Sequence, residues 1–244
     1  MIANTGKEDA EEICEFVKEG KVEVTEDYKY QGIWLNKSGN CHLQIQKVGE
    51  KIKGQIKSIK ALASYGNVGS TFVNVRLQLY ESCIIPALLY NLEGWNKLSK
   101  SEVKKLEQIQ SKALVQLLEI PRSTPYIGLM NEIGMWKVEE RLRYRKIMLY
   151  HNIMTSNNNR LCKRIIVEQE ENEEMDTFCS DVKNMMDVIG IEAKVAIKLQ
   201  KSVLKGIVKE KIDNRMKEIV ISTKKQMKKL RFVKEPVKFQ KKHT

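Results

Sequence analysis

A chain of 244 residues with 42% hydrophobic side chains is long and apolar enough to build a core, which excludes wholesale disorder. Only 4 Pro and 13 Gly exclude collagen-like and low-complexity chains and argue against a β-sandwich. The formal net charge of +12 favours anionic partners such as nucleic acids, although a soluble helical protein can carry the same charge.

Targeting and metal signals are absent from the sequence. Residues 1–10 are polar and lack the apolar core of a signal peptide. The longest apolar-rich stretch, residues 82–92, contains Pro86 and is too short to span a bilayer. The five cysteines and three histidines are too scattered for a zinc or C-x-x-C site. We therefore expect an intracellular protein, cytoplasmic or nuclear and not secreted, without membrane contact, bound metal or cofactor.

Charge and turn residues divide the chain into four predicted segments. Residues 1–40 hold the strand signals, 41–156 are helical, 157–180 form an acidic linker, and 181–244 form a basic helical tail. From residue 180 onward there are 18 Lys and Arg against 7 Asp and Glu, so this quarter carries almost the whole excess charge. The predicted fold class is mainly α, with a small N-terminal β-hairpin before a helical bundle.

Two strands are predicted at the start of the chain. Residues 22–25 alternate in polarity, residues 28–35 are rich in aromatic and β-branched side chains, and residues 36–40 have the composition of a turn. Gly32 inside the second predicted strand indicates a bulge or a close approach of another backbone.

Helical periodicity begins after residue 40. One apolar stripe recurs at three- and four-residue spacing, with Lys53 and Lys57 beside it, and consists of Ile45, Val48, Ile52, Ile56 and Ile59. Residues 65–70 break this helix. Residues 72–90 predict a more apolar helix that Pro86 kinks or divides. Its isolated charge, Arg76, forms either a buried ion pair with Glu93 or Glu107 or a contact to the backbone.

The clearest helix starts at the capping box of Ser99 and Glu102 and stops at Pro121. Lys104, Lys105 and Lys112 lie opposite its apolar face, where they either contact nucleic acid or are ordinary surface charges. Residues 123–125 are predicted to cap a short helix that ends at Gly134.

Another helix is predicted over residues 137–154. Its cations, Arg141, Arg143, Arg145 and Lys146, predict either nucleic-acid contact or a solvated face. Trp95 and Trp136 are interpreted as core residues. Helical signal returns from residue 181 to about residue 208, and we expect fraying at the end of the basic tail.

Several blocks, in order, resemble the end of non-LTR (LINE-type) retrotransposon reverse transcriptases. Residues 28–32 (YKYQG) are similar to the Y-K-Y-L-G strand of these enzymes, with Gln31 in place of Leu. Residues 79–95 resemble their L-Y-x-x-x-I-x-P-x-L-L-Y-x-x-E-x-W block, and residues 120–125 their I-P-x-x-T-P block. Residues 129–141 and 228–232 continue the resemblance, which spans about residue 22 to the end.

The resemblance implies a place and a role for each segment. Residues 1–40 would be the last strands of the polymerase palm, and 41–156 a thumb-like domain. Tyr28, Tyr30 and Gly32 would belong to a primer-grip-like strand, unless Tyr30, Ile33 and Trp34 merely pack the hairpin on the thumb. A thumb holds its duplex by the phosphate backbone, so the expected partners are an RNA–DNA hybrid or a DNA duplex, bound without sequence specificity, and the palm and fingers of a parent polymerase.

Catalysis is not expected from this chain. The resembled enzymes bind Mg²⁺ at an Asp-Asp pair in the palm, and no such pair occurs here, since no Asp lies between Asp27 and Asp176. The resemblance thus implies a fragment of an RNA-directed DNA polymerase that retains duplex binding and lacks catalytic residues. Two alternatives remain: a helical protein–protein interaction module, and an inert remnant of a retroelement.

Overall fold

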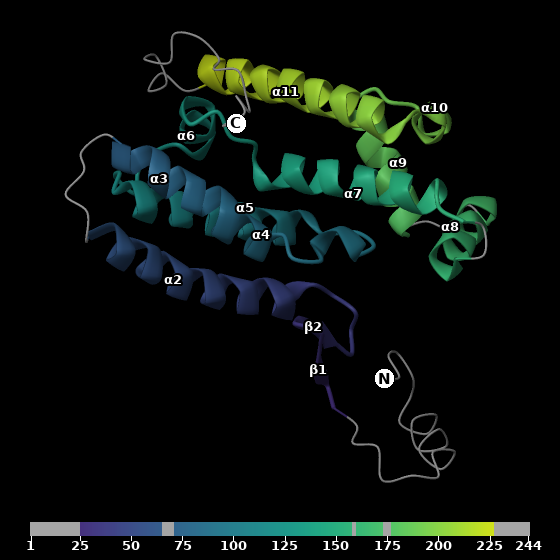
Figure 1. Cartoon of the computed structure of the whole chain (residues 1–244), viewed down its shortest axis with the longest axis horizontal. Coiled ribbons are helices and arrows are strands. Elements are labelled where there is room, and N and C mark those ends of the chain that lie inside the picture. The colour runs from purple at the N-terminus through teal and green to yellow at the C-terminus, as the bar shows by residue number, and fades with distance from the viewer. Residues whose placement is uncertain (1–24, 65–70, 158–159, 173–176, 227–244) are drawn as a thin grey trace.

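The computed structural model describes residues 25–64, 71–157, 160–172 and 177–226. These residues are mainly helical, and a two-stranded antiparallel β-hairpin precedes the helices, which confirms the predicted fold class. The strand predicted at residues 22–25 and the end of the basic tail lie almost wholly outside the described residues. The helices form a stack with α11 at one end and α2, next to the hairpin, at the other (Figure 1).

The hairpin is made by a segment that the sequence predicted as one strand. Strand β1 (Asp27–Tyr30) turns back at Gln31 and Gly32 into β2 (Ile33–Asn36). Both turn residues have positive φ, 46° and 85°, as a two-residue hairpin turn of type I′ requires. Gly32 is therefore a turn residue and not a bulge, and the prediction of a single strand over residues 28–35 was wrong.

Helix α2 (His42–Ser64) buries the predicted isoleucine and valine stripe. All five of its residues are less than 9% exposed, and Ile52 is only 1% exposed. The stripe packs mainly against α5 and β2 and also contacts α4. Burial of this stripe is what holds the first helix to the rest of the stack.

Pro86 divides the next apolar segment, as predicted. Helix α3 (Thr71–Leu79) passes into the π-helix η1 (Tyr80–Ile84) and then into α4 (Ile85–Leu88). Proline has no N–H to donate and its ring crowds the preceding turn. The wider π-turn, in which the Ile85 N–H donates to the Tyr80 carbonyl, precedes it directly and accommodates this crowding.

Helix α5 (Lys100–Leu118) follows the short 3-10 helix η2 (Leu92–Gly94) and begins at the predicted capping box. The Ser99 N–H donates to the Glu102 carboxylate at 2.8 Å, and the Glu102 N–H donates to the Ser99 hydroxyl at 3.2 Å. Helix α6 (Tyr126–Glu132) ends just before Gly134, whose φ is 66°. The predicted end of this helix at Gly134 is therefore confirmed. At its start the N-cap is Pro125, and no side chain caps the helix there.

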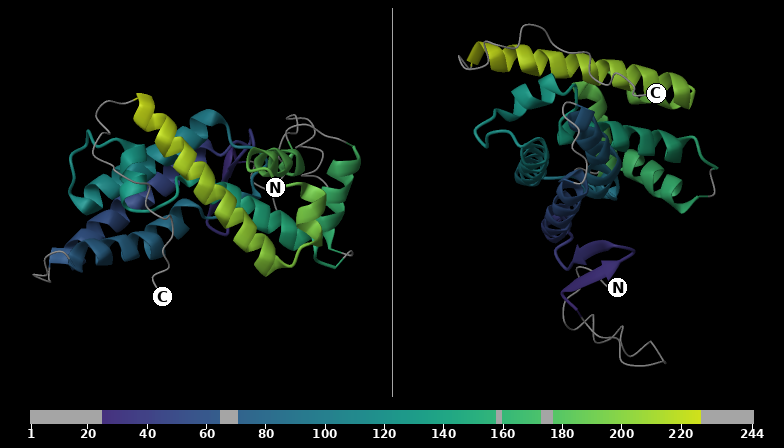
Figure 2. Two further views of the ribbon diagram at one scale, coloured as in Figure 1. Left: turned by 90° about the horizontal axis from the view of Figure 1, so that it is seen from above. Right: turned by 60° about the vertical axis from the view of Figure 1, so that its left-hand side comes forward.

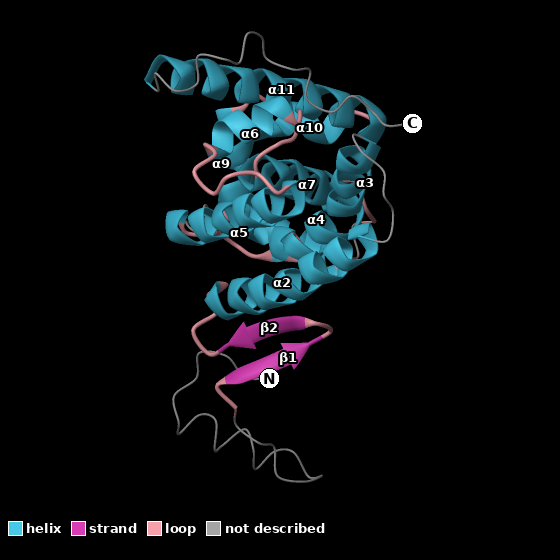
Figure 3. Ribbon diagram, turned by 90° about the vertical axis from the view of Figure 1, so that its left-hand side faces the viewer, coloured by secondary structure: helices cyan, strands magenta, loops and turns pink. Residues whose placement is uncertain are grey.

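Five helices complete the stack (Figures 2 and 3). They are α7 (Val138–Met154), α8 (Leu161–Glu171), α9 (Phe178–Val188), α10 (Ala193–Lys198) and α11 (Lys201–Gln226). Helix α7 lies inside the stack, where it contacts α5, α9 and α11. Two breaks interrupt the helical signal predicted from residue 181 to 208, and Gly190 with a φ of 65° lies in the first of them.

One hydrophobic core joins all the helices. It extends along the described chain from Cys41 to Val220. The predicted acidic linker contains α8 and the start of α9, and the predicted basic tail supplies five α11 core residues, which are Leu204, Val208, Ile212, Met216 and Val220. Among the described residues no helix combines the length and the apolar character needed to cross a membrane.

The cysteines allow a direct test of this core. Cys41 and Cys179 are buried, and burial raises the pKa of their thiols to about 12 and about 11. Cys83 and Cys162 are exposed. Because the thiolate is the reactive form, we expect iodoacetamide at about pH 8 to label Cys83 and Cys162 and to spare the buried pair until urea is added. Peptide mass spectrometry measures this, and equal labelling of all four without urea would indicate a chain that does not fold alone.

Candidate nucleic-acid interface

A groove of about 480 Å³ lies between α2 and α5. It forms because the two helices approach closely at Gly49, where an added Cβ would lie 3.2 Å from the Ile109 Cδ1 atom. Its floor is apolar and is made by Ile45, Ile52, Ile56, Ile109 and Ala113. Polar residues of α2 that flank its apolar stripe therefore form one rim of the groove. Polar residues of α5 that flank its apolar face form the other rim.

Three of the predicted lysines meet at this groove. Lys53 comes from α2, and Lys105 and Lys112 come from α5. All three are exposed. The two lysines of α5 are separated by two helical turns, or about 10 Å along the axis. This arrangement offers cations on both rims to an extended, negatively charged backbone.

The other polar residues of the groove supply further hydrogen-bond donors. Gln46, Gln108 and Gln116 carry amide groups, and amide donors commonly bind phosphate oxygens. Glu50 is the carboxylate among the lining residues, and it pairs with Lys47 at 3.5 Å. The net charge of the groove is therefore positive.

A second hollow of about 420 Å³ continues the groove past Lys112 and adds Arg122. Sequence analysis missed Arg122, because a single cation in a loop has no periodicity to mark it. By contrast, Lys57 and Lys104 are exposed on α2 and α5 but do not line either hollow. The structure thus brings together three of the five lysines that were predicted on α2 and α5.

Two arginines of the predicted cationic cluster on α7 are buried. The Arg141 guanidinium donates to Glu81 at 2.5 and 3.0 Å and to the Trp136 carbonyl at 3.1 Å. The Arg143 guanidinium pairs with Glu140, whose side chain is fully buried. Both interpretations of this cluster required exposed side chains, and for these two residues that requirement fails.

Lys146 and Arg145 also have partners inside the fold. The fully buried Lys146 Nζ donates to the Asn96 carbonyl at 2.8 Å and to Asp181 at 2.5 Å. Burial lowers the pKa of this ammonium, and Asp181 opposes that effect. The half-buried Arg145 pairs with Glu93 at 2.7 Å. The α7 cations are therefore compensated within the fold, and their geometry does not support the predicted nucleic-acid contact.

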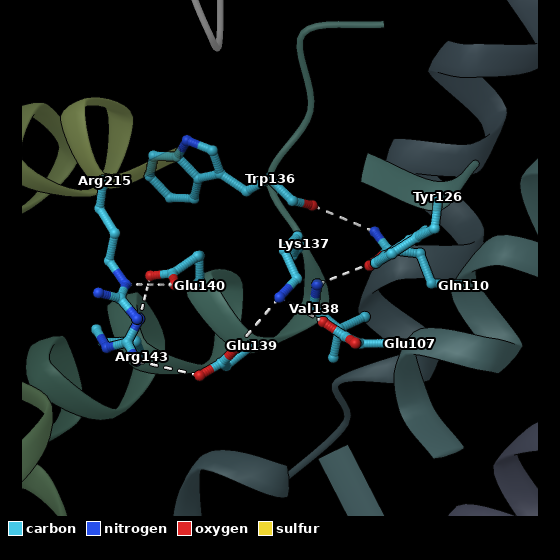
Figure 4. Close-up of polar contacts among 10 residues, drawn as sticks. All are labelled: Glu107, Gln110, Tyr126, Trp136, Lys137, Val138, Glu139, Glu140, Arg143 and Arg215. Carbon is cyan, nitrogen blue, oxygen red and sulfur yellow. Dashed lines mark hydrogen bonds and ion pairs between the residues drawn. The ribbon is translucent and has the colours of Figure 1, made fainter. Parts of the chain in front are cut away.

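Arg143 and Glu140 belong to a network of polar contacts that joins α7 to α5 and α11 (Figure 4). Gln110 of α5 accepts from the Val138 N–H at 2.9 Å and donates to the Trp136 carbonyl at 3.3 Å. Arg215 of α11 donates to Glu140 at 3.0 Å. Trp136 is buried, as predicted, and Trp95 is half-buried against the core.

Arg76 contacts the backbone, which was one of its two predicted roles. Its guanidinium donates to the Leu117 carbonyl at 2.7 Å and lies 3.4 Å from Glu119. The two acidic residues considered from the sequence pair with other cations, Glu93 with Arg145 and Glu107 with Lys137.

The tyrosines of the hairpin are exposed. Tyr28 and Tyr30 are 46% and 53% exposed, so Tyr30 does not serve to pack the hairpin on the helices. Gly32 lies under the ring of Tyr90, whose hydroxyl donates to the Gln31 carbonyl at 3.0 Å. The close neighbour of Gly32 is thus a side chain and not the backbone that the sequence indicated, and contact of this strand with a primer stays a prediction.

A hollow of about 660 Å³, here called the hairpin pocket, lies between the hairpin, α2 and α4. Lys29, Lys47 and Lys51 line it, and sequence analysis did not select any of them as a binding residue. The ammonium groups of Lys29 and Lys47 lie 5.8 and 5.6 Å from the centre of the Trp34 ring, within range of cation–π attraction.

Within residues 25–226, apart from the gaps stated above, no group of three or more His, Cys, Asp or Glu could hold a metal ion. No protein-family model, no curated protein and no solved structure matches this chain.

Proposed function

We propose that this chain is the palm-end and thumb portion of a non-LTR retrotransposon reverse transcriptase, and that it binds an RNA–DNA hybrid or a DNA duplex without catalysing polymerisation. The groove between α2 and α5 carries the binding proposal, because Lys53, Lys105 and Lys112 line it together. The family assignment rests on the ordered sequence blocks. The palm and fingers of a parent polymerase would be its protein partners.

The chemistry of the groove fits contact with a nucleic-acid backbone. Lysine and glutamine side chains bind phosphate oxygens and hold a duplex in place, but phosphate contacts carry no base sequence information. A hybrid duplex is A-like, and proteins recognise such duplexes mostly through shape, 2′-hydroxyls and phosphates. The proposal is therefore binding without sequence specificity.

Replacing Lys53, Lys105 and Lys112 together with glutamine tests this groove. Each phosphate contact contributes about −0.9 to the slope of log affinity against log salt, so the triple variant is expected to bind more weakly with a slope shallower by about 3. Fluorescence anisotropy with a labelled hybrid and a labelled DNA duplex, over a salt series, measures both quantities.

The matched control replaces Lys194, Lys201 and Lys205 with glutamine, which removes the same charge from exposed positions on α10 and α11. This control is expected to keep nearly the original slope. Equal losses in both variants would mean that net charge alone, and not the groove, governs binding. Absence of duplex binding by the unaltered chain at low salt would remove the proposal.

The chain alone is expected to add no nucleotide to a primer. The reason is the lack of an Asp-Asp pair to bind the two catalytic metal ions. A primer-extension assay with an RNA template, Mg²⁺ and all four deoxynucleotides is the measurement. Incorporation that depends on the purified chain would contradict this expectation and the fragment assignment with it.

One observation favours the alternative of a protein–protein interaction module. On α8, Leu161 and Ile165 lie one helical turn apart and are 66% and 44% exposed. Sedimentation analysis distinguishes the two functions: strong self-association without duplex binding supports the interaction module, and a monomer that binds duplex supports the proposed function.

A further inference from the structure

The hairpin pocket has an uncompensated positive charge. Three lysines line it, and none of its lining residues is an Asp or Glu. Lys47 has a carboxylate partner, Glu50, but both side chains are well exposed and the pair is weak. For Lys29 and Lys51 the structure shows no carboxylate partner among the residues that it describes. This concentration of ammonium groups favours an anionic occupant.

The pocket also has groups suited to a polypeptide. Pro86, Ala87 and the half-exposed ring of Tyr90 form an apolar wall. The Oε1 atom of Gln55 is buried and accepts no hydrogen bond from the described residues. A peptide backbone supplies both N–H donors and carbonyl acceptors, so it can satisfy the Gln55 amide in either orientation.

The same chain contains an acidic segment, and the sequence that joins it to the hairpin is long enough for it to reach the pocket. Residues 8–16 (EDAEEICEF) lie outside the described part of the chain, and their sequence holds five carboxylates, no Lys or Arg, and the apolar residues Ile13 and Phe16. Strand β1, which carries Lys29, begins at Asp27. The ten residues between 16 and 27 allow a span of up to about 35 Å from residue 16 to residue 27.

We propose that residues 8–16 bind the hairpin pocket of their own chain, with their carboxylates at Lys29, Lys47 and Lys51 and an apolar side chain against Tyr90. Covalent linkage keeps the segment at a high effective concentration, so several weak ion pairs suffice to hold it. This inference does not depend on the proposed function, because the pocket lies on the flank of α2 that faces the hairpin and not in the groove with α5.

Native cysteines provide the test. Cys14 lies within the acidic segment, Cys83 is exposed and lines the pocket, and Cys162 is exposed on α8 away from it. With diamide as oxidant at low salt, the full chain is expected to form the Cys14–Cys83 disulfide about tenfold faster than Cys14–Cys162. Peptide mass spectrometry without reduction quantifies the two products, and 0.5 M NaCl is expected to remove the difference.

Charge reversal supplies the matched comparison. Replacing Lys29 and Lys51 with glutamate is expected to lower the Cys14–Cys83 rate to that of Cys14–Cys162. Replacing Lys57 and Lys104 with glutamate makes the same charge change at exposed positions outside the pocket, and the preference for Cys83 is expected to persist. Equal rates at Cys83 and Cys162 in the unaltered chain would overturn the proposal.

A nucleic acid is the rival occupant. If added DNA duplex protects Cys83 from iodoacetamide while the unaltered chain shows no preferential Cys14–Cys83 disulfide, the pocket belongs to the nucleic acid and the proposal fails. If the Cys14–Cys83 disulfide forms preferentially in a chain that binds no duplex, docking of the acidic segment is supported and duplex binding is rejected. Failure of one hypothesis can therefore be distinguished from failure of the other.

Discussion

Replacing Asp181 with alanine is expected to lower the free energy of unfolding by about 3 to 5 kcal/mol, because it leaves a buried ammonium without its carboxylate. Lys146 is fully buried and lies 2.5 Å from Asp181. The Asn96 carbonyl, at 2.8 Å, would remain as its partner, but a neutral carbonyl cannot balance the charge. Urea denaturation followed by circular dichroism measures the loss.

Asp187 provides the control on the same helix. It is exposed, so its replacement with alanine is expected to change the free energy of unfolding by less than about 0.5 kcal/mol. Adding Lys146→Met to the Asp181→Ala variant is expected to recover most of the loss, because a buried pair can be replaced by apolar groups of similar volume. A loss at Asp181 no larger than at Asp187 would mean that Lys146 is hydrated in solution.

Replacing Gln110 with leucine is expected to cost about 3 kcal/mol, because it leaves two buried donors without acceptors. The Gln110 Oε1 atom accepts from the Val138 N–H at 2.9 Å and from the Tyr126 hydroxyl. Leucine has a similar size, so the loss reports the hydrogen bonds rather than a cavity. The Trp136 carbonyl keeps a donor, the Nε of Arg141 at 3.1 Å.

The same substitution at Gln116 separates this effect from any general change in α5. Gln116 lies on the same helix and is exposed. Its replacement with leucine is expected to alter the free energy of unfolding by less than about 0.5 kcal/mol. Similar losses at the two positions would show that the network in Figure 4 does not stabilise the fold.

Local patterns predicted the helices correctly wherever one signal dominated. The isoleucine stripe of α2, the capping box at Ser99 and the division at Pro86 depend on neighbours within a few residues. The hairpin turn escaped prediction because Gln31 is not a residue that usually adopts positive φ. A Gln-Gly pair inside an aromatic-rich run therefore resembled strand more than turn.

Long-range pairing explains the misinterpreted α7 cluster. Glu81, which pairs with Arg141, lies 60 residues earlier in the chain, and Asp181 lies 35 residues after Lys146. No local pattern connects these residues, so the cations looked like a surface patch. The groove between α2 and α5 could not be predicted for the same reason. The sequence placed its lysines on the faces of two helices, but it did not show that these helices pack against each other at Gly49.

The position of α11 has a consequence for how the chain is made. A ribosome releases α7 before α11, yet two groups in this region find their partners on α11. Glu140 of α7 accepts from Arg215, and the indole of Trp136, in the loop before α7, donates to Asp213 at 2.7 Å. Until α11 emerges, the nascent chain must keep this glutamate hydrated and this side of the core open. The core is therefore completed only after Val220 has been synthesised, and a chain interrupted before residue 201 would present an apolar surface to chaperones.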